Sequence, residues 1–161
     1  MKLHALVLAS LAALMAAPAA GAGTVDVVFV KPEAYTDAGF GSVERERNLD
    51  MLARHMQALA ERLPDSQALR IEVLDVDLAG EVRPLRRWPD IRVLKGGVDW
   101  PRMTLRWTLT DAGRPVQSAE DHLADMAYLM RSSRLGDSQP LGYDLRMVDD
   151  WFRARFAVVA K

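Results

Sequence analysis

The stretch Ile91–Trp107, which reads IRVLKGGVDWPRMTLRW, contains the two period-two runs that decide the expected fold. In the second run apolar residues alternate with Arg and Thr, so one face of that strand is expected in the core and the other in water. The apolar members of this run are Met103, Leu105, Trp107 and Leu109. The first run, Ile91–Lys95, is separated from it by Gly96–Pro101. The pattern predicts a β-hairpin with an unusual loop, in which Trp100–Pro101 is a candidate for a cis bond.

Upstream of this hairpin, the sequence predicts a strand and then a helix. Val25–Val30 is apolar on both faces except for Asp26, which is typical of a central strand covered on two sides. The predicted helix has Ser42 as its N-cap and ends before Pro64. Its apolar residues recur at helical spacing, so it is expected to pack on the sheet.

A second strand is predicted at Leu69–Leu78, where the apolar positions change phase near Leu74. This change indicates either a β-bulge or two strand-end carboxylates, Asp75 and Asp77, that project beyond the core.

Three further elements are predicted in the C-terminal part of the chain. Arg114–Gln117 follows a turn sequence and is expected to form a short strand. Ser118–Asp121 matches a capping box, which predicts a helix that continues to Met130. A last helix is predicted from Tyr143 to Phe156 by its apolar stripe.

The order of these elements predicts an α+β fold with one mixed sheet of roughly four to five strands and about three helices. The first strand–helix–strand unit is expected to be a right-handed crossover between parallel strands, and the later strands an antiparallel meander. The first and last helices are expected to cover one sheet face together.

The N-terminus has the pattern of a cleavable signal peptide at residues 1–22. A short positive start precedes the apolar run Ala5–Ala17, and Ala20–Ala22 is a small-residue cleavage site before Gly23. The apolar run ends at Pro18 and is shorter than the roughly 20 residues that a membrane-spanning helix needs. A retained membrane anchor is therefore the less favoured interpretation. We expect residues 23–161 to form a single globular α+β domain in the periplasm.

Composition restricts the classes of function. The chain has no cysteine, which excludes disulfides, thiolate chemistry and a lipid anchor on cysteine. Its 21 basic and 22 acidic residues nearly balance, so net charge gives no reason to expect nucleic acid or an anionic membrane surface as a partner.

Motifs for metals, phosphate and cofactors are incomplete. Asp75, Asp77 and Gly80 match the start of a calcium loop, but Ala79 and Arg86 stand where two further oxygen ligands are required. The pair Gly96–Gly97 lacks the Lys and Ser or Thr of a phosphate loop, so its expected role is a backbone turn. We therefore expect no bound metal and no cofactor.

Hydrolytic motifs are also incomplete. His55 and His122 have neither metal-ligand spacing nor a nearby GxSxG motif. A catalytic serine triad stays an open alternative, because its members need to be close in space and not in sequence. The serines available to one are Ser42, Ser118, Ser132, Ser133 and Ser138. No catalytic residue is assigned.

Arginine and tryptophan are concentrated in the middle of the chain. This cluster indicates a surface for an anionic or aromatic partner, such as a protein or an envelope component. The alternative is a solvated sheet face whose arginines pair with nearby aspartates while each Trp covers an edge of the core. The cluster contains Arg83, Arg86, Arg87, Trp88, Arg92, Trp100, Arg102 and Arg106. The candidate binding residues are Asp75, Asp77, Asp99, Trp100, Arg102 and Arg106.

Four sequence blocks also carry a family resemblance. They are PEAYTDAG at 32–39, DVDLAGE at 75–81, DIRVLKGGVDWPRMTL at 90–105 and MVDDWF at 147–152. Together they resemble a family of small secreted proteobacterial proteins known only as a domain of unknown function. The resemblance implies a periplasmic setting and brings no activity, cofactor or catalytic residue.

These observations favour a non-catalytic binding or assembly module for an envelope component or a protein partner. The alternative is a hydrolytic enzyme that uses Asp75, Asp77 and Asp99, because sites tend to form at strand ends.

Overall fold

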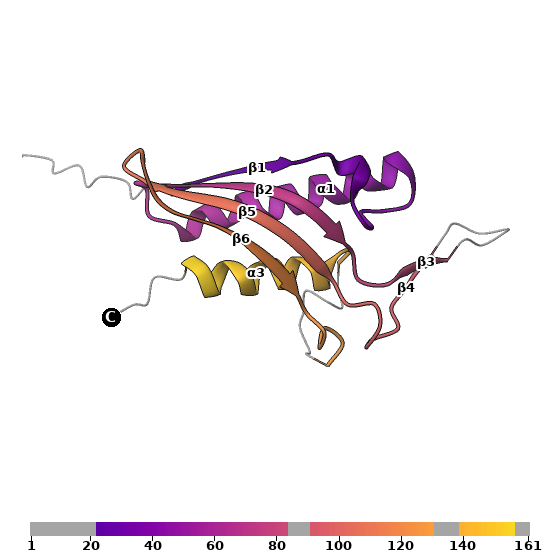
Figure 1. The fold of residues 1–161 in the computed structure, drawn as a ribbon. Coiled ribbons are helices and arrows are strands. Elements are labelled where there is room, and N and C mark those ends of the chain that lie inside the picture. The colour runs from indigo at the N-terminus through magenta and orange to yellow at the C-terminus, as the bar shows by residue number, and fades with distance from the viewer. Residues whose placement is uncertain (1–21, 84–90, 131–138, 157–161) are drawn as a thin grey trace, which may run out of the picture.

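A mixed four-stranded sheet forms the centre of the protein, in the order β1–β2–β5–β6. The computed structural model describes residues 22–83, 91–130 and 139–156. The strands are β1 (Thr24–Phe29), β2 (Gln67–Asp77), β5 (Arg102–Asp111) and β6 (Arg114–Ala124). β1 runs parallel to β2, and β2, β5 and β6 pair antiparallel (Figure 1). The α+β class and the mixed sheet are confirmed, and the handedness of the β1–β2 connection stays a prediction.

Two α-helices pack on one face of this sheet in the described part of the chain. They are α1 (Gly41–Ala58), which continues into the 3-10 helix η2 (Leu59–Arg62), and α3 (Gly142–Phe156). A further 3-10 helix, η1 (Pro32–Ala34), follows β1. Leu52 of α1, Phe152 of α3 and Trp107 of β5 belong to one buried core cluster. The two helices therefore share a single hydrophobic core with one side of the sheet, as predicted (Figure 1).

The opposite face of the sheet is open and carries a row of ion pairs. Arg70 contacts Asp26 at 2.7 Å on one side and Glu72 at 3.5 Å on the other. Arg106 contacts Glu72 at 3.5 Å and Glu120 at 3.1 Å. The prediction that Val25–Val30 is a central strand is wrong, since β1 is an edge strand and Asp26 lies on this open face.

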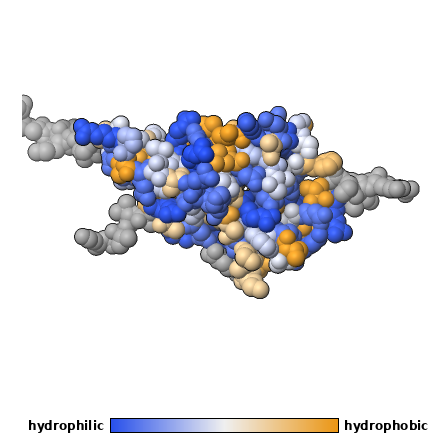
Figure 2. Space-filling view, in the orientation of Figure 1, coloured by the Kyte–Doolittle hydropathy of each residue, from blue (hydrophilic) through white to orange (hydrophobic). Residues whose placement is uncertain are grey.

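The predicted hairpin between Ile91–Lys95 and Met103–Leu109 is also wrong. The short strand β4 (Ile91–Val93) pairs with β3 (Glu81–Arg83) in a separate two-stranded sheet, and β5 pairs with β2 and β6. The alternation in β5 was read correctly, because Met103, Leu105 and Trp107 are buried. Ile91 is 48% exposed, so the first run buries little apolar surface in the core. In Figure 2 hydrophobic residues form several separate patches on the visible face, with hydrophilic residues between them.

The helix predicted from Ser118 to Met130 is instead the second half of β6, followed by turns. β6 pairs with β5 along Arg114–Ala124, with one register shift near Thr110. Asp121 and Leu123 point into the core at a period of two, while Glu120 and His122 face the open side. Strand pairing thus overrides the local capping-box pattern, and the short strand predicted at Arg114–Gln117 is correct but too short.

The phase change in β2 is a β-bulge, one of the two predicted explanations. The β2–β5 register shifts between Val73 and Asp75. Val76 is fully buried after the shift, whereas Asp75 and Asp77 are only partly buried. The bulge keeps the apolar residues of the strand on the core side.

Several predictions fall outside the described residues. They concern residues 1–21 of the signal peptide, Arg86, Arg87 and Trp88, and Ser132, Ser133 and Ser138. Within the described ranges no helix is long and apolar enough to cross a membrane. No peptide bond in these ranges is cis, so Trp100–Pro101 is trans.

Candidate functional site

Four of the six predicted binding residues meet in one hollow near the carboxyl end of β2. Asp77, Asp99, Trp100 and Arg102 line this hollow, which has a volume of about 270 Å³. Asp75 lines a neighbouring hollow that also includes Asp77 and Arg102. Arg106 lines neither of these hollows and contributes to the ion pairs of the open sheet face.

The carboxylates at the end of β2 are engaged in structural contacts. Asp75 accepts hydrogen bonds of 2.8 Å from both the backbone N–H and the hydroxyl of Thr36. Asp77 accepts a hydrogen bond of 2.8 Å from Nε of Arg102. The Arg102 guanidinium also lies 5.2 Å from the ring centroid of Trp100, a distance suited to a cation–π contact. These contacts match the alternative in which the arginines pair with nearby aspartates.

Asp99 organises the loop that precedes β5. It accepts hydrogen bonds from Gly96 N at 2.8 Å, Lys95 N at 2.5 Å and the Tyr128 hydroxyl at 2.7 Å. Burial opposes the charged form, but these hydrogen bonds outweigh it and hold the pKa of Asp99 below its ordinary value. Gly96 and Gly97 have φ values of 68° and 75°, so the pair serves the backbone turn as predicted.

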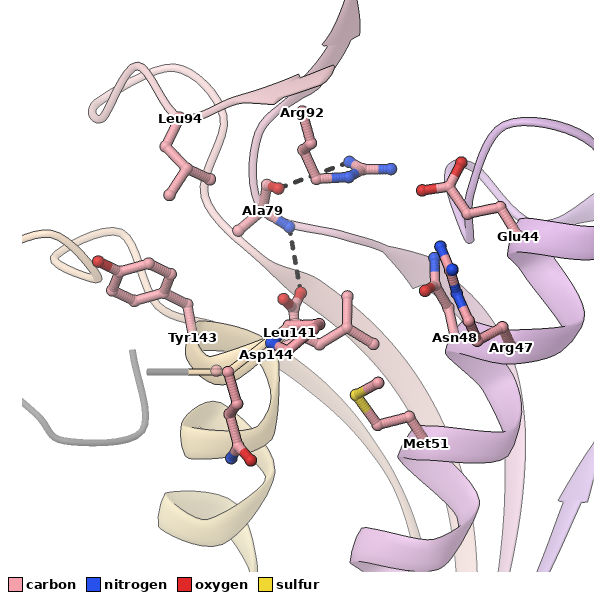
Figure 3. Close-up of a pocket in the computed structure, with 13 residues that line it drawn as sticks. Glu44, Arg47, Asn48, Met51, Ala79, Arg92, Leu94, Leu141, Tyr143 and Asp144 are labelled. Atoms are coloured by element: carbon pink, nitrogen blue, oxygen red, sulfur yellow. Dashed lines mark hydrogen bonds between the residues drawn. The ribbon is translucent and has the colours of Figure 1, made fainter. Parts of the chain in front are cut away.

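A larger pocket lies between α1, the segment after β2, β4 and the N-terminus of α3. Its volume is about 400 Å³ (Figure 3). The residues that line it are Glu44, Arg47, Asn48, Met51, Ala79, Arg92, Leu94, Gln139, Pro140, Leu141, Gly142, Tyr143 and Asp144. Arg92 is the one lining residue that also belongs to the arginine and tryptophan cluster predicted from the sequence, because the lining comes from segments far apart in the chain. The sequence does contain one signal for this pocket: Asp144 falls four residues before Val148, so it is a charged residue on the apolar face of α3.

Arg92 forms a fixed polar wall of this pocket. Its guanidinium donates two hydrogen bonds to the Asp37 carboxylate, at 2.8 and 3.1 Å, and a third to the Gly80 carbonyl at 3.0 Å. Gly80 has a φ of 87°, and an added Cβ would lie 2.8 Å from the Leu94 side chain. The close turn after β2 and the bidentate ion pair therefore position Arg92.

Asp144 is a buried carboxyl group in the first turn of α3. It is 3% exposed, and its Oδ1 accepts a hydrogen bond of 3.1 Å from Ala79 N. Burial raises the pKa of Asp144 to about 7, although the Ala79 amide and the charge of Arg92 act in the opposite direction. Near neutral pH this group is therefore divided between its neutral and charged forms.

Residues of α1 form the opposite wall. Asn48 is 5% exposed and donates from Nδ2 to the Ala38 carbonyl at 3.0 Å. Its Oδ1 accepts no hydrogen bond from the described residues, and Figure 3 shows the Asn48 amide at the cavity wall. Glu44 accepts a hydrogen bond of 2.8 Å from Phe40 N, which closes the start of α1. The remaining wall is apolar and consists of Met51, Leu94, Leu141 and the ring of Tyr143.

His55 and His122 lie outside this pocket. His55 Nε2 is 3.0 Å from Asp149 Oδ1 at the α1–α3 contact, and His122 Nδ1 is 3.1 Å from the Thr104 hydroxyl. Among the described residues no group of three or more His, Cys, Asp or Glu could hold a metal ion.

Fold and pocket together define a small α+β domain with a two-helix layer on one sheet face and a partly polar pocket at the end of that layer. The chain belongs to the family described as protein of unknown function (DUF3016), whose model matches residues 23–154. This confirms the family resemblance found from the four sequence blocks. Neither the curated proteins nor the solved structures include a match to the chain.

Proposed function

We propose that this protein is a non-catalytic binding module of the periplasm, and that the pocket between α1 and α3 is its binding site. The observation that carries the proposal is a cavity of about 400 Å³ with positioned polar groups on some walls and an apolar surface on the others. Ligand pockets typically have volumes of roughly 300 to 1,000 Å³ and combine an apolar lining with a few placed polar groups.

Contacts within the protein hold the polar groups of the pocket in place. Arg92 is held by Asp37 and Gly80, and Asp144 is fixed by Ala79 N. A ligand that enters the pocket would therefore meet little of the cost of ordering side chains, which usually reduces affinity. This preorganisation favours a binding role for the pocket.

Screening of a small-molecule library by ligand-observed NMR, with the substitution Met51→Trp, tests the proposal. Met51 lines the pocket, so the larger Trp side chain is expected to fill it and abolish binding. Met126→Trp is a matched control, because Met126 is 66% exposed and lies outside the pocket. Hits that bind both variants equally would contradict the assignment of the site.

A second candidate is a partner surface at the hollow formed by Asp77, Asp99, Trp100 and Arg102. Its support is the convergence of these residues beside Val98, which is 72% exposed. Pull-down from envelope extracts with the wild type and with a Trp100→Ala, Arg102→Ala double variant tests it. Identical partner sets for the two proteins would remove the hollow as the contact surface.

The hydrolytic alternative stays a prediction. Asp75 and Asp99 are each held by several hydrogen bonds, an arrangement that favours a structural role for both. Turnover of esterase, phosphatase or glycosidase substrates by the wild type, and its loss in Asp75→Asn or Asp99→Asn, would restore the enzymatic hypothesis.

A further inference from the structure

The charges around the large pocket favour a cation over an anion. Arg47, Arg92, Glu44 and Asp144 line the pocket, and Asp37 pairs with Arg92. Arg92 already donates to both Asp37 oxygens, so its charge is largely neutralised before any ligand arrives. Once Asp144 ionises, the surroundings carry one more negative than positive charge. An anionic ligand would add to this excess, whereas a cation would balance it.

The pocket also offers hydrogen-bond acceptors on two of its walls, from Asn48 and Asp144. The Asn48 side chain is 5% exposed, and its Oδ1 accepts no hydrogen bond from the described residues. Asp144 Oδ1 accepts a hydrogen bond of 3.1 Å from Ala79 N, and a carboxylate has further lone pairs that can accept from a ligand. A ligand that carries hydrogen-bond donors matches these acceptors.

The two acceptors lie on walls that come from different helices. Asp144 lies in the first turn of α3 and Asn48 lies on α1, with the cavity between them (Figure 3). Met51 and Leu141 lie beside them and offer an apolar surface to the rest of a ligand. An ammonium group has three donors and no acceptor, which suits this arrangement.

We infer that the pocket binds a small molecule that carries a primary ammonium group on an apolar body. The ammonium group donates to the Asp144 carboxylate and to Asn48 Oδ1, and the apolar body packs on Met51, Leu94 and Leu141. This inference rests on the proposed binding function and adds the chemical class of the ligand.

Binding of this class requires the charged form of Asp144. The charged groups around Asp144 are Arg92 and Asp37 on one side and Glu44 and Arg47 on α1. Because the pKa of Asp144 is about 7, the charged fraction rises from about one tenth at pH 6 to about nine tenths at pH 8. An alkylammonium ion keeps its proton over this range. Affinity is therefore expected to rise about ninefold between these two pH values.

Hexylamine, hexan-1-ol and hexanoate form a matched set of probes that differ in the head group. Each is titrated into the ¹⁵N-labelled mature protein, and the amide signals of pocket residues report binding. The variants are Asp144→Asn, which cannot ionise but keeps an acceptor for Ala79 N, and Asp50→Asn. Asp50 lies on α1 outside the pocket and pairs with Arg54, so its substitution controls for the change in net charge.

The expected result is that hexylamine binds most tightly, gains affinity from pH 6 to pH 8, and loses about tenfold or more in Asp144→Asn but not in Asp50→Asn. Tightest binding of hexanoate or hexan-1-ol would overturn the ammonium class and leave the binding pocket intact. Equal hexylamine affinity in Asp144→Asn and Asp50→Asn would also overturn it. If none of the probes shifts the pocket signals, the proposed binding function fails together with this inference.

Discussion

Replacing Asp121 by Ala is expected to weaken the joint between the sheet and α3. Asp121 lies on β6 and is 8% exposed. Its Oδ2 accepts hydrogen bonds from the indole N–H groups of Trp107 at 2.7 Å and Trp151 at 2.9 Å, and its Oδ1 accepts one from Arg155. Burial opposes the charged form, but the three donors hold the pKa of Asp121 below its ordinary value. One carboxylate thus joins β5, β6 and α3.

The expected loss follows from the groups that Asp121→Ala leaves without partners. Trp107 is 1% exposed and Trp151 is 8% exposed, so neither indole N–H can readily turn to water. Each such buried donor costs about 1 to 3 kcal/mol when it is left unpaired. Arg155 is partly exposed and is expected to add at most about 1 kcal/mol. We therefore expect the free energy of unfolding to fall by about 2 to 7 kcal/mol, out of the roughly 5 to 15 kcal/mol typical of a domain.

Urea unfolding, followed by tryptophan fluorescence and far-UV circular dichroism, measures this loss. Asp121→Asn is a graded control, because one amide oxygen can still accept from both indoles while the contact with Arg155 is lost. Arg155→Ala removes only the partly exposed partner. The expected order of destabilisation is Asp121→Ala, then Asp121→Asn, then Arg155→Ala. The reasoning is refuted if Asp121→Ala lies within about 1 kcal/mol of the wild type, or if Arg155→Ala costs as much.

Three further outcomes are expected. Burial raises the pKa of Asp144 from 3.8 to about 7, so the folded protein loses stability as the pH rises through this window and the buried carboxyl group ionises. Asp144→Asn should therefore raise the free energy of unfolding by about 2 to 4 kcal/mol at pH 8 and have little effect at pH 4. An equal change at both pH values in urea unfolding would contradict this. Gly80→Ala should lower the free energy of unfolding by about 1 to 3 kcal/mol, because φ at this position is 87° and the new Cβ would lie 2.9 Å from Val93 O. A melting temperature equal to that of the wild type would speak against this account. Deletion of residues 2–22 should retain the protein in the cytoplasm, whereas the full chain should yield a periplasmic form that begins at Gly23; cell fractionation and N-terminal sequencing check both, and export of the truncated chain would contradict the assignment of a signal peptide.

The sequence predicted elements correctly where a long pattern agrees with the final packing. Leu49, Leu52 and Met56 recur at helical spacing and are buried in α1, and Val148 and Phe152 do the same in α3. The phase change in β2 was also visible, because the apolar residues after Val73 move to the other parity. In these segments the local period and the buried face are the same property of the chain.

Local patterns failed where two structures compete for the same residues. Ser118–Asp121 fits a capping box, yet these residues extend β6, since pairing with β5 satisfies their backbone groups and buries Asp121 beside two indoles. Ile91–Lys95 alternates like a sheet strand, yet β4 pairs with β3 because β2 and β6 occupy both edges of β5. Period alone does not say which strand is the partner.

The candidate site shows the same division. The sequence by itself determined the family, the α+β class, the buried face of β5 and the two long helices, because each depends on residues close together in the chain. Only the tertiary structure decided that Asp77, Asp99, Trp100 and Arg102 share a hollow, and that Asn48, Arg92 and Asp144 enclose a pocket. The physical reason is that a pocket is formed by side chains from separate elements, and their distances are fixed by the packing of the whole core.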